Sequence, residues 1–176
     1  MAKKRLKVDI FSKSSVDNLM KDLQMYQNNL QMKCHLFVQR LAEKGVEIAK
    51  IRIDTLDAIF TGELKSSIHS ELKISTDTMV IFSVVASSEH AVFVEFGTGQ
   101  VGQEAPYPYP FPNDVNWNYN TGETIFEISP GQYGWFYPGK DGQWYFTQGM
   151  PARPFMYETA IELRRIVEKT AKEVFA

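Results

Sequence analysis

The chain has 176 residues, of which 44% are hydrophobic and 23% are charged, and this length and composition are typical of one globular domain. Its single cysteine excludes an internal disulfide framework and a metal site of paired cysteines, and it favours a reducing compartment. No apolar run reaches the roughly 20 residues that span a bilayer, and the charged start lacks the apolar core of a signal peptide. The composition therefore predicts a soluble protein made in a cytosol, without membrane contact.

Positive charge gathers at the start of the chain. Residues 1–13 hold five basic residues and one acid, a net charge of +4, so the remaining residues together carry −6. A protein that binds nucleic acid through a basic face would not have this balance. We interpret residues 1–13 as a basic arm in solvent, with a phosphate contact as the alternative, and residues 14–176 as a single domain.

A long amphipathic helix is predicted after the arm. Ser14 and Ser15 are good helix caps, and the apolar residues that follow recur at three- and four-residue steps. A helix from residue 15 to about residue 52 would be roughly 55 Å long. We therefore expect either a bend near Gly45 or packing of part of the helix on another subunit. The apolar stripe consists of Val16, Leu19, Leu23, Tyr26, Leu30, Cys34, Phe37, Leu41 and Ile48.

Short elements are expected in the next part of the chain. A turn and a short amphipathic stretch at 61–68 precede two strands, 70–75 and 79–86, which are joined by a tight turn. The second strand is almost continuously apolar, and we predict that both of its faces are buried. Residues 91–96 are predicted to form a third strand or a short irregular element.

Composition changes sharply between Gly97 and Pro154. This stretch holds all eight prolines, nine of the eleven glycines and all three tryptophans, which favours turns and short strands over a long helix. Residues 107–112 should be extended, because proline biases its predecessor away from the helix. Two aromatic runs flank a five-residue connection that contains glycine, and they predict a β-hairpin within an insertion at about 99–149. The aromatic runs are Trp135, Phe136, Tyr137, Trp144, Tyr145 and Phe146.

Three interpretations of these aromatic residues remain open. They could pack on one another as the core of the loop, or form a contact surface for another protein, where Tyr and Trp are enriched. They could also bind carbohydrate by stacking. Stacking on nucleic-acid bases would need interleaved basic residues, and this stretch has only Lys140 and Arg153.

The chain is predicted to close with a helix that Pro154 introduces. The opposite face of this helix balances acidic and basic residues, and Glu168 with Lys172 makes a favourable i,i+4 pair. Its apolar face is predicted to consist of Met156, Ala160, Leu163, Val167, Ala171 and Val174.

No catalytic or metal-binding constellation emerges from the sequence. Cys34 lies in the apolar stripe of the first helix, so we interpret it as a packing residue and not as a nucleophile. His90 and Glu95 would lie on opposite faces of a strand. The sequence therefore predicts a protein that is not an enzyme and that needs no cofactor or metal. The histidines lie in different predicted elements, at no metal-ligand spacing: His35, His69 and His90.

Three motifs in a fixed order resemble a known family. They are Thr-Gly-Glu-Leu at 61–64 with Ser-Ile at 67–68, Ala-Val-Phe-Val-Glu-Phe-Gly-Thr at 91–98, and Gly-Met-Pro-Ala-Arg-Pro-Phe at 149–155 before the terminal helix. This succession resembles the tail-component proteins of tailed bacteriophages, described as head–tail joining, neck or tail-completion proteins. The residues that carry the resemblance are Thr61, Gly62, Leu64, Glu95, Phe96, Gly97, Thr98, Arg153, Pro154 and Phe155.

The resemblance runs from about Leu41 to the C-terminus, apart from the aromatic insertion. That insertion looks like the version found in phages and prophages of low-GC Gram-positive hosts. One departure is local: Ile59 and Phe60 stand where the family usually has proline and aspartate.

The resemblance implies an α+β fold with a long N-terminal helix, an antiparallel β-sheet with the hairpin insertion, and a C-terminal helix packed on the sheet. It implies a non-enzymatic role in the virion neck, joining the DNA-filled head to the tail after assembly in the host cytoplasm. The expected partners are copies of the chain in a ring (hexamer or dodecamer), the head connector or stopper protein, and the tail terminator or tail tube protein. DNA would only pass through the channel, and the acidic balance of residues 14–176 suits that role because like charges repel phosphate. The alternatives are a tail terminator, a minor tail protein or a carbohydrate-binding accessory protein.

Overall fold

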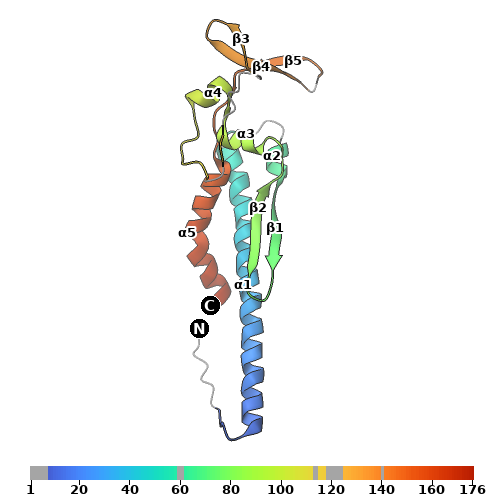
Figure 1. Ribbon diagram of the computed structural model, residues 1–176, viewed down its shortest axis with the longest axis vertical. Helices are drawn as coiled ribbons and strands as arrows, with labels where there is room; N and C mark the ends of the chain where they lie inside the picture. The colour runs from blue at the N-terminus through green and yellow to red at the C-terminus, as the bar shows by residue number, and fades with distance from the viewer. Residues whose placement is uncertain (1–7, 59–61, 113–114, 118–124, 140) are drawn as a thin grey trace. The chain divides into compact units, whose positions relative to one another are not determined.

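The computed structural model describes residues 8–58, 62–112, 115–117, 125–139 and 141–176. Most of the predicted basic arm, together with Ile59, Phe60, Thr61 and Lys140, lies outside these residues. The contacts divide the chain into two compact units, 1–47 with 69–85 and 161–176, and 48–68 with 86–160. The elements, drawn in Figure 1, are α1 (Lys13–Thr55), α2 (Glu63–Ser66), β1 (Ile68–Ser75), β2 (Val80–Ala86), α3 (Ala91–Phe96), α4 (Gly99–Glu104), β3 (Phe126–Ser129), β4 (Gln132–Pro138), β5 (Trp144–Thr147), β6 (Gly149–Met150) and α5 (Phe155–Phe175).

The predicted α+β class is confirmed, with a long N-terminal helix, antiparallel sheets and a C-terminal helix. Helix α1 runs without interruption through Gly45. A Cβ atom added to Gly45 would lie 2.7 Å from Val84 Cγ2 and 3.1 Å from Leu163 Cδ1. The glycine therefore allows β2 and α5 to approach the helix backbone closely, and it does not end the helix.

In the first unit, the end of α5 packs along α1. The rings of Phe37 and Phe175 meet edge-on with their centroids 5.8 Å apart. Lys44 Nζ donates to Thr170 Oγ1 at 3.1 Å and pairs with Glu173 at 3.2 Å. These contacts place the end of α5 over the apolar stripe of α1 at Phe37.

The β1–β2 hairpin also packs on α1 in this unit. The rings of His35 and Phe82 are 5.4 Å apart, and Gln31 Nε2 donates to the carbonyl of Asp77 at 2.8 Å. The two strands and their tight turn agree with the prediction. Burial of both faces of β2 was a wrong prediction, since Ile81 is 37% exposed. The sheet has only two strands, and Phe82 faces α1 while Ile81 points to the opposite side.

The buried face of α5 differs from the predicted one. Ala160 and Val167 are exposed, whereas Thr159 and Thr170 are buried. Thr159 Oγ1 donates to the carbonyl of Phe155 at 2.7 Å, which satisfies its hydroxyl group inside the helix. A pattern counted from apolar residues alone misses such threonines. Cys34 on α1 is likewise exposed, so its predicted packing role was wrong.

The second unit builds its core from elements far apart in the sequence. Buried side chains include Ile53 from α1, Leu64 from α2, Val94 from α3 and Phe155 from α5. Residues 91–96 form the helix α3, so the prediction of a strand or irregular element was wrong. The β-branched content of this segment favours a strand, but tertiary packing overrides such preferences in short segments. The insertion also contains the short helix α4, although its glycines and prolines exclude a long one.

Candidate functional site: the motif junction and the aromatic sheet

The second and third of the three sequence motifs meet at one place in the second unit. Glu95 is 7% exposed, and its two carboxylate oxygens accept the backbone N–H groups of Met156 at 2.9 Å and Tyr157 at 3.1 Å. The backbone N–H of Arg153 donates to the carbonyl of Val94 at 2.8 Å. Thus α3 supplies a carboxylate cap for the start of α5, where the first N–H groups lack partners within the helix. We call residues 95–98 and 153–155 the motif junction.

The carboxyl group of Glu95 has an unusual pKa. The pKa of Glu95 is raised to about 6, chiefly by burial and to a smaller extent by the charge of Glu158, while the hydrogen bonds from Met156 and Tyr157 oppose this shift. Both oxygens are occupied by backbone donors. The carboxyl group therefore fastens α3 to α5. Among the described contacts, no hydrogen bond or ion pair joins it to His90 for acid–base chemistry.

Other residues of the resemblance also serve the scaffold. Arg153 Nε donates to the carbonyl of Leu56 at 3.0 Å, which ties the third motif to the end of α1. Phe155, Pro154 and Leu64 are buried, and Gly62 begins α2 with a φ of 76°. The motif residues that the structure describes thus hold elements together.

The glycines on either side of Thr98 bring two backbone segments close together. Thr98 forms a β-bridge with Met150, and Gly99 forms one with Gly149. A Cβ atom added to Gly97, whose φ is 77°, would lie 2.7 Å from Ala152 N, and one added to Gly149 would overlap the carbonyl of Thr98. These glycines permit close backbone approach.

One group of aromatic residues forms a core of its own around Phe96. The ring of Phe96 lies 4.9 Å from Tyr107, 5.5 Å from Phe111 and 5.5 Å from Trp117. Trp117 Nε1 donates to the carbonyl of Gly97 at 2.8 Å. The self-packed interpretation therefore describes Tyr107, Phe111 and Trp117. This cluster was not predicted, although aromatic residues at every second position of 107–111 were a signal for it.

The predicted aromatic hairpin is present and belongs to a three-stranded sheet. Strands β3, β4 and β5 pair antiparallel, with Phe136 opposite Phe146 and Tyr137 opposite Tyr145. Strand β3 was not predicted. The ring of Phe146 lies over Gly134, where an added Cβ atom would come 2.6 Å from Phe146 Cζ.

The two faces of this sheet differ in chemistry, and both carry exposed side chains: Tyr133, Tyr137 and Tyr145 on one face are 36% to 45% exposed. Because side chains alternate along a strand, the other face presents residues that are 36% to 68% exposed. We call it the Phe/Trp face, and it consists of Phe126, Phe136, Trp144 and Phe146. The opposite face, the Tyr face, carries Tyr133, Trp135, Tyr137 and Tyr145.

The two tryptophans of the hairpin have different surroundings. Trp135 is half-buried, and its Cζ3 atom lies 2.8 Å from where a Cβ atom of Gly99 would stand. Trp144 is 68% exposed. Trp135 therefore anchors the sheet at α4, whereas Trp144 projects into solvent.

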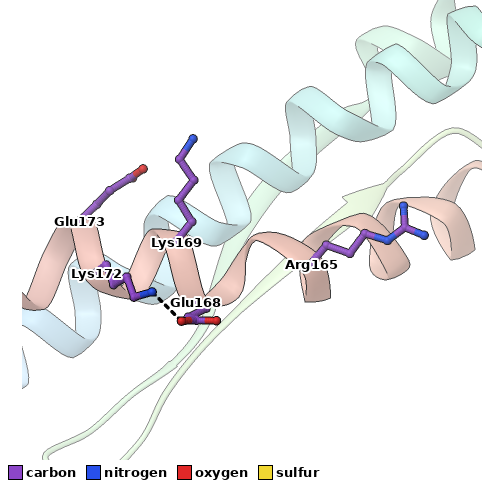
Figure 2. A pocket seen from close by; sticks show the side chains of 5 residues that line it. All are labelled: Arg165, Glu168, Lys169, Lys172 and Glu173. Atoms are coloured by element: carbon purple, nitrogen blue, oxygen red, sulfur yellow. Dashed lines mark hydrogen bonds and ion pairs between the residues drawn. The ribbon is translucent and has the colours of Figure 1, made fainter.

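A hollow on α5 is shown in Figure 2. Its lining consists of charged side chains from neighbouring turns of this one helix, and Lys172 pairs with Glu168 at 2.6 Å, as the sequence predicted. Such a surface is a solvated helix face. Its lining residues are Arg165, Glu168, Lys169, Lys172 and Glu173.

Within the described part of the chain, no three His, Cys, Asp or Glu side chains form a group that could hold a metal ion. The helices described there include none with the length and apolarity needed to cross a membrane. Family models, curated proteins and solved structures gave no match to this chain.

Proposed function

We propose that this protein is a non-enzymatic component of the neck of a tailed phage. In this proposal it joins the DNA-filled head to the tail as part of a homo-oligomeric ring around the DNA channel. It assembles in the host cytoplasm and contacts the head connector or stopper on one side and the tail terminator or tube on the other. The order of the three motifs supports the family, and the exposed Phe/Trp face supports the joining role.

The Phe/Trp face has the composition of a binding surface. Its four aromatic side chains expose on the order of 500 Å² of apolar area, which is comparable to the largest patch on a typical monomer, and such patches are often functional. Exposed tryptophan and phenylalanine residues lose contact with water when a partner covers them, and such residues dominate binding energies. Trp135 and the β4–β5 pairing hold this face in one geometry, so that less entropy is lost on binding.

The motif junction complements this surface. The side chains of Glu95 and Arg153 form hydrogen bonds with backbone groups of the same unit, and Phe155 is fully buried. The family residues therefore maintain the scaffold, while the insertion provides the contact surface. These observations support the proposed role by shape and adhesion.

The proposal is tested by assembly in the phage that encodes the chain. The double variant Phe136→Ala/Trp144→Ala removes the most exposed ring of each strand β4 and β5. We expect filled heads and finished tails that do not join, counted by electron microscopy of lysates. Tyr133→Ala, on the opposite face and 45% exposed, is the matched control and should give normal yields.

Other outcomes have clear meanings. Joined virions at normal yield from the double variant would contradict the docking role of the Phe/Trp face. Tails of abnormal length would favour the tail-terminator alternative, because a terminator caps tail growth and a joining protein does not.

A further inference from the structure

We propose that the N-terminal half of α1 carries two apolar stripes that pack on α1 of two neighbouring copies and so close the ring. The first stripe is Leu19, Leu23, Tyr26 and Leu30, and the second is Met25, Met32 and Leu36. This inference rests on the homo-oligomeric part of the proposed function and assigns the surface that forms the oligomer.

The apolar stripe of α1 continues beyond the part that its own chain covers. Helix α5 packs on this stripe at Phe37 and ends at Phe175. In Figure 1, the blue half of α1 extends past the end of α5 and past the β1–β2 turn. Leu23 and Tyr26 are 50% and 63% exposed there. A helix covers the stripe further along, so another helix suits its uncovered part.

The exposed area is sufficient for a subunit contact. Six side chains of the two stripes, all but Leu19, are 39% to 74% exposed. Together they present on the order of 700 Å² of apolar surface, about half of it on each stripe, so that each stripe is within the range of the largest patch on a typical monomer. Contact between the first stripe of one copy and the second stripe of the next buries this area in each interface, and flanking amide side chains add polar area. The total approaches the roughly 1,000 Å² of a specific interface.

The charge pattern favours a second copy of this helix as the occupant. The ten residues from Leu23 to Met32 include no charged side chain, whereas a helix that faces solvent normally has a charged face. Two such helices side by side bring no like charges together. The segment of this chain next to α1, residues 1–13, carries a net charge of +4 and does not match an uncharged apolar surface.

The angle between the stripes favours a closed ring over a dimer. At 3.6 residues per turn, the two stripes lie roughly 130° apart around the helix axis. In a ring of parallel helices each helix meets two neighbours, at about 120° for six copies and about 150° for twelve. A two-fold dimer would use a single stripe, so the second stripe would stay uncovered.

The experiment uses the full chain and two charge variants, one for each stripe. Leu23→Glu/Leu30→Glu disrupts the first stripe, and Met25→Glu/Met32→Glu disrupts the second. All four residues are exposed, so helix content measured by circular dichroism should be unchanged. Gln24→Glu, an exposed position on the side of the helix away from both stripes, is the matched control.

Native mass spectrometry and light scattering give the outcome. We expect a multimer for the unmodified chain and for Gln24→Glu, and monomers for each stripe variant alone. Mixing the two stripe variants should give one-to-one heterodimers, because each retains the stripe that the other lacks. If the stripe variants remain multimeric, this inference is wrong while the ring proposal stands. If the unmodified chain is a monomer at every concentration tested, the ring proposal fails together with this inference.

Discussion

A single residue, Glu95, makes the stability of the protein depend on pH. Its pKa is raised from 4.5 to about 6 by burial in the folded state. Between these values the folded chain binds more protons than the unfolded chain, so the free energy of unfolding falls as pH rises through this window. The stability contributed by the protonated form is fully present below pH 4.5.

The expected loss between pH 4.5 and pH 7 is about 2 kcal/mol, from 1.36 kcal/mol per pKa unit. Urea unfolding of the unmodified chain and of Glu95→Gln across this range measures it. Glutamine does not titrate, so only the unmodified chain should lose stability through Glu95 as pH rises. The unfolding free energy of the unmodified chain minus that of Glu95→Gln should therefore decrease with pH. Parallel pH profiles would show that Glu95 is not the titrating group.

Gly149 is a second residue that affects stability, because there is no room for a Cβ atom at this position. Its φ is 99°, and an added Cβ atom would overlap the Thr98 carbonyl, so Gly149→Ala must displace the bridge between two backbone segments. We expect a loss of about 3 kcal/mol in the free energy of unfolding. Gly142→Ala is the control, since Gly142 has a φ of 77° but open space around it, and it should cost about 1 kcal/mol. Equal losses in urea unfolding would argue against the close approach.

At the scale of elements, Gly45 sets how closely β2 can lie to α1. Alanine at this position favours the helix by about 1 kcal/mol, but its Cβ atom would lie 2.7 Å from Val84 Cγ2. Overpacking of this kind costs about 1–3 kcal/mol. We therefore expect Gly45→Ala to destabilise the unmodified chain and to be neutral or stabilising in a Val84→Ala background.

A double-mutant cycle in urea measures this coupling. A coupling of at least about 1 kcal/mol supports direct contact between the two positions. Additive effects of the two substitutions would contradict the described packing of β2 on α1.

The elements that the sequence predicted correctly have strong local signals. The repeat of apolar residues at three- and four-residue steps defined α1 to within three residues at each end. The aromatic runs around a glycine-containing connection defined the β4–β5 hairpin. In both cases the pattern lies within one continuous segment.

The features that the sequence did not predict depend on distant segments. Glu95 and the N–H groups that it caps are separated by 61 and 62 positions, and no local pattern links them. Thr159 is an exception, because its hydroxyl group is satisfied locally within its own helix while its polar side chain conceals its burial in the sequence. The different surroundings of Trp135 and Trp144 follow from the position of Gly99, which strand periodicity does not reveal.

For the whole molecule, we propose three tasks for three parts of the chain. The motif junction maintains the scaffold, the Phe/Trp face would contact another neck component, and the N-terminal half of α1 would contact further copies. The two proposed contact surfaces consist of exposed apolar side chains on regular elements. In this proposal the chain acts by assembly in the virion neck.

Electron cryomicroscopy of the virion neck is the decisive experiment for this proposal. We expect a ring of this chain around the DNA channel, with the Phe/Trp face buried against a second protein and acidic side chains facing the lumen. A mature virion without this chain would contradict the proposal, and so would a ring whose lumen is lined by lysine and arginine.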